Sequence, residues 1–159
     1  MKAADSVWVA TALLQHERGE DADFAAEEIL DRVRAEHLWD RDIGTLKQHV
    51  YKHNVAQLSA QPNIHRLLTR TSRGRRRLFR AGDPYDPARE RGKTHPEAAD
   101  VPEQYRSLVA WYLTTFGRGC GAEAESPLLK LRELSLELGI WKGIDPDEYV
   151  RELRRDWHK

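Results

Sequence analysis

Residues 42–55 have the sequence DIGTLKQHVYKHNV, and residues 65–80 have the sequence HRLLTRTSRGRRRLFR. The first segment repeats apolar residues at helical spacing, at Ile43, Leu46 and Val50. This spacing predicts a helix over residues 42–55 with one apolar face. In the second segment, apolar pairs lie on both sides of Gly74, and a central glycine is typical of a hairpin turn. We therefore expect a helix followed by a basic β-hairpin.

Two more amphipathic helices are predicted before this pair. The first runs from about Val7 to Gly19, and the second begins at Asp23, a residue type that favours the N-cap position, and ends near Trp39. Three helices and a hairpin follow one another in a winged helix-turn-helix domain. We assign such a domain to residues 1–81.

The chain after the hairpin is predicted to contain a loop, a helix and an arm. Residues 82–102 contain four prolines and few apolar residues, which favours a surface loop or linker. A helix is predicted over residues 103–116, and segment 103–117 either braces the first domain or forms a homodimer contact. Residues 126–159 form an amphipathic C-terminal arm. The expected fold class is mainly α with a small β-hairpin.

The charges of the chain are segregated, although the 26 basic and 26 acidic residues cancel. Residues 1–40 carry 4 basic and 10 acidic side chains, whereas residues 41–80 carry 10 basic and one acidic side chain. Screening limits charge effects to about 10 Å, so the basic block attracts phosphate whatever the total charge is. This pattern favours duplex DNA as a partner.

The predicted DNA contacts lie on the helix over 42–55 and on the hairpin. The second of two paired helices enters the major groove in such domains, so its polar face supplies Thr45, Lys47, Gln48, His49, Tyr51 and Lys52. The hairpin supplies Arg66, Arg70, Arg73, Arg75, Arg76 and Arg77. Arginines there mainly neutralise phosphates, whereas Lys47 and Gln48 are suited to base edges. The alternative is a solvated hairpin on a domain that contacts only proteins.

Residues 5–81 resemble a bacterial winged-helix domain found in restriction and defence systems. The resemblance is carried by four stretches: VWVATALLQ, FAAEEILDRV, DIGTLKQHV and RTSRGRRRLFR. It implies binding to double-stranded DNA.

Residues 126–157 resemble the C-terminal toxin-binding tail of bacterial antitoxins. The matching pattern is a leucine-rich turn, a glycine break with tryptophan, and a closing DPDEYVRELRRDW. The residues that the resemblance assigns to toxin binding are Leu128, Leu131, Leu134, Leu138, Trp141, Tyr149, Val150, Arg151, Leu153, Arg154 and Trp157. In the family the partner is often a PIN-domain ribonuclease. The alternative is that this tail packs on its own domain or on a dimer mate.

Together these patterns predict a cytoplasmic antitoxin that represses its own operator through the winged helix and neutralises a toxin with its arm. Two alternatives remain: a DNA-binding accessory module of a restriction or defence system, and a winged-helix interaction module without DNA function. Their genetic neighbours would differ, because an accessory module is expected beside a large nuclease or helicase gene.

Several classes of function are not expected from this sequence. No apolar run approaches the roughly 20 residues that span a bilayer. The chain has one cysteine, Cys120, and carries no phosphate-binding loop or hydrolase motif. His49 and His53 have a spacing that two metal ligands can share, but no third ligand is evident. We therefore expect no enzyme activity, no metal and no cofactor.

Overall fold

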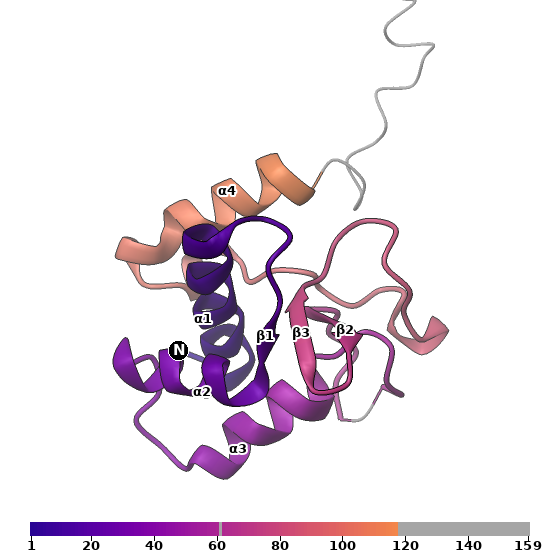
Figure 1. The fold of residues 1–159 in the computed structure, drawn as a ribbon, viewed down its shortest axis with the longest axis horizontal. Coiled ribbons are helices and arrows are strands. Elements are labelled where there is room, and N and C mark those ends of the chain that lie inside the picture. The colour runs from indigo at the N-terminus through magenta and orange to yellow at the C-terminus, as the bar shows by residue number, and fades with distance from the viewer. Residues whose placement is uncertain (61, 118–159) are drawn as a thin grey trace, which may run out of the picture. The chain divides into compact units, whose positions relative to one another are not determined.

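The computed structural model describes residues 1–60 and 62–117. Its helices are α1 (Ala3–Arg18), α2 (Ala26–Ala35), α3 (Ile43–Gln48) and α4 (Arg106–Phe116), with a π-helical turn, η1 (His49–His53), directly after α3. Its strands are β1 (Phe24–Ala25), β2 (Leu68–Ser72) and β3 (Arg75–Leu78). Three 3₁₀ turns follow: η2 (Pro87–Arg89), η3 (Ala98–Asp100) and η4 (Glu103–Tyr105). The strands form an antiparallel sheet in the order β1-β3-β2, so a mainly helical fold with a small β element is confirmed (Figure 1).

Helix α1 lies at the centre of the described unit, between α4 on one side and α3 on the other (Figure 1). The predicted inward stripe is buried, and so are polar residues of α1, among them Asp5, Ser6, Thr11 and Gln15. Gln15 accepts a hydrogen bond of 3.1 Å from the backbone N–H of Leu78, at the end of β3. A buried polar group stabilises the fold only when it has such a partner. Gln15 thereby connects the central helix to the sheet.

Helix α2 begins at Ala26, so the prediction that it begins at Asp23 was wrong. Strand β1 occupies the residues between, where it pairs with β3. A strand of two residues is too short to show an alternating pattern in the sequence. A residue of α2 caps the N-terminus of this helix, because Oε2 of Glu28 accepts a hydrogen bond of 2.8 Å from the N–H of Ala25.

Helix α3 begins where the sequence predicts. The carboxylate of Asp42 accepts a hydrogen bond of 3.1 Å from the N–H of Thr45, as expected of an N-cap. Gly44 leaves room for this cap, since a Cβ there would lie 2.6 Å from a carboxylate oxygen of Asp42. The predicted inward residues that are fully buried are Leu46 and Val50.

The hairpin of β2 and β3 falls within the predicted range, and its turn contains Gly74 at φ +81°. Glycine adopts this left-handed conformation without the strain that a Cβ would cause. The apolar residues that the prediction assigned to the hairpin are all buried: Leu67, Leu68, Leu78 and Phe79.

Residues 82–102 form a loop, but it is bound to the domain rather than being a bare linker. Lys93 forms an ion pair of 2.6 Å with the buried carboxylate of Asp5 on α1. Arg89 is fully buried and donates to backbone carbonyls of the chain between η1 and β2, at Leu58 (2.6 Å), His53 (2.8 Å) and Ser59 (3.0 Å). No sequence pattern predicts these contacts, because each partner is distant along the chain.

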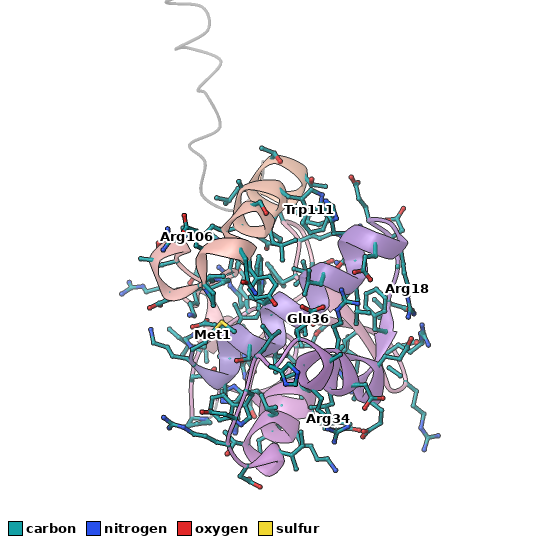
Figure 2. The ribbon with its side chains drawn as sticks, turned by 90° about the vertical axis from the view of Figure 1, so that its left-hand side faces the viewer. Met1, Arg18, Arg34, Glu36, Arg106 and Trp111 are labelled. Carbon is teal, nitrogen blue, oxygen red and sulfur yellow. The ribbon has the colours of Figure 1, made fainter. Side chains whose placement is uncertain are left out.

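Helix α4 covers α1 on the side away from α3. The helix predicted over residues 103–116 begins at Arg106, because residues 103–105 form the 3₁₀ turn η4, and the expected inward residues of both elements are buried: Tyr105, Leu108, Val109, Tyr112 and Phe116. The ring of Tyr112 meets that of Trp8 edge to face at 5.5 Å, and its hydroxyl donates to the carbonyl of Phe79 at 2.6 Å. Figure 2 shows Arg106 and Trp111 on the same helix. These contacts pack α4 on the domain, and its role as a brace or as a homodimer contact stays a prediction.

Candidate nucleic-acid interface

The polar side of α3 and η1 is exposed to solvent. Its exposed members are Thr45, Lys47, Gln48, Tyr51 and Lys52. The π-helical turn contains one more residue per turn than an α-helix, so residues after position 48 do not keep the simple helical spacing of the prediction. Lys47 and Lys52 form no ion pair with any residue that the structure describes.

His49, predicted as a DNA contact, is half-buried instead. Its Nδ1 lies 3.1 Å from the amide oxygen of Asn54, and its ring packs edge to face with His53 at 5.2 Å. Burial lowers the pKa of His49, and the hydrogen bond to Asn54 opposes this only in part. His49 therefore does not belong to the exposed residues of α3 and η1.

Tyr51 and Arg76 join η1 to the hairpin. The guanidinium carbon of Arg76 lies 5.0 Å from the centre of the Tyr51 ring, a cation–π distance. Arg76 is only 4% exposed, and it donates to the carbonyl of Gly74 at 3.2 Å. Burial lowers the pKa of Arg76. Arg76 is therefore a buried side chain in contact with Tyr51, whereas the sequence predicted an exposed DNA contact.

Two of the predicted hairpin contacts, Arg75 and Arg77, are neutralised by aspartates. Arg75 pairs with Asp23 at 2.6 Å, and both terminal nitrogens of Arg77 bond the carboxylate of Asp83 at 2.7 Å. Hydrogen bonds from Thr71 and then Arg75 lower the pKa of Asp23. Burial alone would raise the pKa of Asp83, but the hydrogen bonds from Arg77 and Thr69 outweigh it and the pKa is lowered.

These pairs assign a structural role to part of the basic block. Arg80 is also paired, with Asp21 at 2.9 Å. The aspartates come from the segment before β1 and from the loop after β3, so the pairs hold the hairpin in place on the domain. The acidic excess of residues 1–40 was the signal that could have revealed them, but no rule of sequence spacing matches an aspartate to its arginine over such distances.

Arg70 and Arg73 are the exposed hairpin arginines that carry no carboxylate partner within the described residues. They line a hollow of about 500 Å³ together with Thr71 and Ser72. Gln57 holds the backbone of β2 behind this hollow, because its side-chain amide bonds both the N–H (3.1 Å) and the carbonyl (3.0 Å) of Arg70. Gln57 was not predicted from the sequence.

Arg66, the remaining predicted contact, does not belong with this group. Its guanidinium carbon lies 4.5 Å from the centre of the Tyr85 ring, and its Nε donates to the carbonyl of Gly92 at 3.3 Å. The predicted partner-binding residues of 126–157 lie outside the described residues.

We give the name helix–hairpin face to the predicted DNA contacts that are exposed and form no ion pair within the described residues. It consists of Thr45, Lys47, Gln48, Tyr51, Lys52, Arg70 and Arg73. Its chemistry is that of hydrogen-bond donors and positive charges, with Arg76 below. Two acids touch this face: Asp42 accepts from the N–H of Thr45 at 3.1 Å, and Glu27 of α2 accepts a hydrogen bond of 3.3 Å from the Tyr51 hydroxyl. Such a face suits a polyanion.

The described residues contain no cluster of three or more histidine, cysteine or acidic side chains arranged to hold a metal ion. Within residues 1–60 and 62–117, no helix has the length and apolar character needed to cross a membrane. Comparisons with protein-family models, with curated proteins and with solved structures each found no match for this chain. Its function must therefore be argued from its own residues.

Proposed function

We propose that this protein binds double-stranded DNA as a winged helix-turn-helix protein. The exposed side of α3 and η1 would enter the major groove, and the hairpin would lie as the wing along the neighbouring backbone. The element order α1-β1-α2-α3-η1-β2-β3 supports this proposal, because the strand pair is the next sheet element after the paired helices. The contact between Tyr51 and Arg76 supports it too, since it joins the hairpin to the helix.

The observation that carries the proposal is the division of the basic residues into paired and unpaired sets. Arg75, Arg77 and Arg80 have aspartate partners, which reduces their attraction for phosphate. The cations of the helix–hairpin face have no such partners among the described residues: Lys47, Lys52, Arg70 and Arg73. A protein that neutralises phosphates with unpaired cations releases bound counterions, so its affinity for DNA falls steeply with salt.

The test is the salt dependence of duplex binding by the full-length protein, measured by fluorescence anisotropy. In the double variant Arg70→Gln with Arg73→Gln, the slope of log affinity against log salt should become shallower by about two. The matched control is Arg91→Gln with Arg106→Gln, which removes the same charge from exposed residues of the 82–102 loop and α4. The control should keep the wild-type slope.

Two results would contradict the proposal. Absence of duplex binding by the wild-type protein at low salt would reject DNA binding as such and favour a protein-interaction module. Equal slopes in both double variants would show that DNA lies on another surface.

We also propose that the chain is an antitoxin whose residues 126–157 neutralise a toxin, the role predicted from the DPDEYVRELRRDW pattern. The test is co-expression with the protein encoded beside it, with bacterial growth as the readout. Arg151→Ala with Arg154→Ala should abolish rescue while duplex binding stays unchanged. Rescue that is as strong as in the wild type would reject this role of the two arginines, and a neighbour without toxicity would favour the accessory-module alternative.

A further inference from the structure

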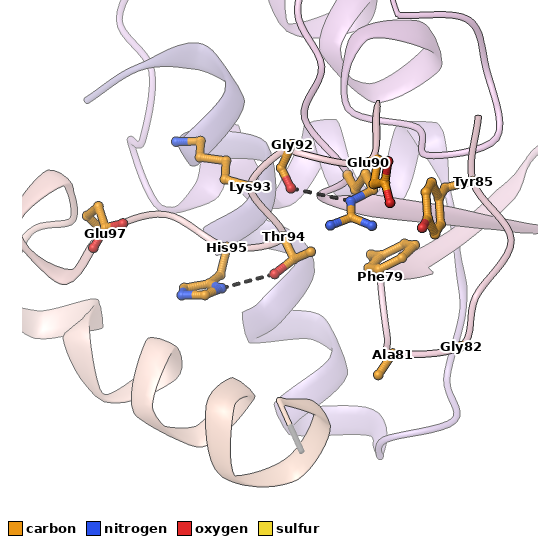
Figure 3. A pocket seen from close by; sticks show the side chains of 11 residues that line it. Phe79, Ala81, Gly82, Tyr85, Glu90, Gly92, Lys93, Thr94, His95 and Glu97 are labelled. Atoms are coloured by element: carbon orange, nitrogen blue, oxygen red, sulfur yellow. Dashed lines mark hydrogen bonds between the residues drawn. The ribbon is translucent and has the colours of Figure 1, made fainter. Parts of the chain in front are cut away.

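An open cavity of about 590 Å³ lies between the loop that leaves β3 and the loop over residues 90–97 (Figure 3). This volume is in the range of sites for small molecules. None of the residues of the helix–hairpin face lines the cavity. It is therefore a candidate binding site separate from the proposed DNA contact.

One wall of the cavity holds an arginine on two aromatic rings. The guanidinium carbon of Arg66 lies 4.5 Å from the ring centre of Tyr85 and 5.3 Å from that of Phe79. Its Nε donates to the carbonyl of Gly92 at 3.3 Å, which fixes the plane of the group. Side chains held in this way are already ordered before a ligand arrives, and this lowers the entropy cost of binding.

Arg66 forms no ion pair with any residue that the structure describes, although Glu90 also lines the cavity. The other strong cation of the lining, Lys93, is already paired with Asp5 at 2.6 Å. A guanidinium has five N–H donors in a planar fork that matches a carboxylate or a phosphate. Arg66 is therefore the cation in this lining that is left to bind an anion.

The opposite wall is formed by Thr94 and His95 (Figure 3). Nδ1 of His95 lies 3.1 Å from the hydroxyl of Thr94, and its ring packs on Tyr112 at 5.6 Å between centres. Burial lowers the pKa of His95, so its imidazole is neutral at pH 7 and presents a flat, uncharged ring. Flat rings thus border the cavity on two sides, His95 on one and Tyr85 on the other.

The backbone between the two walls leaves no room for a side chain at position 92. A Cβ on Gly92 would lie 1.6 Å from the carbonyl oxygen of Ile64, so only glycine fits there. The same Gly92 supplies the carbonyl that holds Arg66. The packing of Gly92 against Ile64 therefore also sets the position of the Arg66 guanidinium.

We propose that this cavity binds a small molecule with one anionic group, a carboxylate or a phosphate, attached to a flat ring. The anionic group pairs with the guanidinium of Arg66, and the ring lies between Tyr85 and His95. Glu90 and Glu97 at the cavity edge disfavour ligands with a second negative group directed toward them.

The test uses the full-length protein with four probes, followed by NMR shifts of the backbone amides and by thermal unfolding. Benzoate and phenyl phosphate each carry an anionic group directly on a flat ring, inorganic phosphate carries the charge alone, and benzamide carries the ring alone. At millimolar concentrations, benzoate or phenyl phosphate should shift the amides of residues 66, 85 and 92–95 and raise the unfolding temperature. Because these two probes share the same ring, the one that binds more tightly identifies the anionic group as carboxylate or phosphate.

Variants make the assignment specific to Arg66. Arg66→Met keeps a long side chain over Tyr85 but removes the charge, so affinity should fall about tenfold or more. Arg91→Met, which removes the same charge outside the lining, should leave affinity unchanged. Arg66→Lys should restore part of the affinity, and Glu90→Gln should increase it by removing a repulsion.

Four outcomes would overturn the proposal. They are the absence of shifts with both ringed anions, equal binding of benzamide, equal binding of phosphate alone, and weaker binding in Glu90→Gln. Unchanged affinity in an Arg66→Met protein that unfolds at the wild-type temperature would also overturn it.

Discussion

At the scale of single residues, Arg89 stabilises the domain more than any sequence pattern suggests. Its buried guanidinium donates to the carbonyls of Leu58, His53 and Ser59. His53 ends η1, so a positive charge there also opposes the partial negative charge of a helix C-terminus. One side chain thus satisfies several backbone acceptors.

Replacing Arg89 should therefore be costly. In Arg89→Met the carbonyls lose their donors while the volume is largely kept, so the free energy of unfolding should fall by about 3 kcal/mol or more. Arg91→Met, at an exposed position two residues away, should change it by less than about 0.5 kcal/mol. Urea unfolding of both variants measures the difference, and a loss in Arg89→Met no larger than in the control would contradict this role.

At the scale of elements, three half-buried histidines lie in η1 and in the loops before β2 and after β3: His49, His65 and His95. Burial is the main cause that lowers the pKa values of His49, His65 and His95. The charged or titratable groups that act on these histidines are Asp5, His49 (on His65), His53, Arg89, Lys93 and Glu97. Asp5 favours the protonated form of His49 and His65, but its carboxylate already pairs with Lys93, and burial outweighs its effect.

This burial predicts a dependence of stability on pH. Below their ordinary pKa of 6.5, these histidines bind protons more readily in the unfolded chain than in the folded one. The free energy of unfolding should therefore be highest above pH 7 and should fall between about pH 7 and pH 5. Thermal unfolding across this range measures it, and His65→Gln should flatten the curve. An unfolding temperature that is constant or rises on acidification would contradict the prediction.

Local patterns predicted the helices, because each helix shows its apolar stripe within its own residues. The buried stripe of α2, for example, is contained in Ile29, Leu30 and Val33. Strand β1 was missed since two residues show no period, and the π-helical turn was missed because its register depends on packing around His49. The candidate site was predicted in part: Arg70 and Arg73 were placed by their positions in the hairpin, whereas the neutralisation of Arg75 and Arg77 depends on aspartates distant in sequence.

At the scale of the whole molecule, a net charge of zero is combined with unpaired cations on one face. Two acids of residues 1–40 are neutralised within the molecule, because Asp21 pairs with Arg80 and Asp23 pairs with Arg75. Other acids of this segment remain exposed, among them Glu20, Glu27 and Asp31. Copies of the protein can therefore attract one another, acidic surface to basic surface, with no overall repulsion to oppose it.

We predict reversible self-association at low ionic strength near pH 7. The hydrodynamic radius, measured by dynamic light scattering, should be large in low salt and should fall as salt screens the opposed surfaces. The variant Arg70→Gln with Arg73→Gln should associate less, because it lacks part of the basic surface. A radius that does not change with salt would contradict the electrostatic origin of this association.

The central position of α1 also has a consequence for synthesis. Its residues leave the ribosome early, but the ring that packs edge to face on Trp8 belongs to Tyr112 of α4, which is among the last of the described residues to emerge. A nascent chain that ends before α4 exposes part of this apolar helix to water and to chaperones. Pausing of translation after the codons for α4, rather than before them, would therefore favour productive folding.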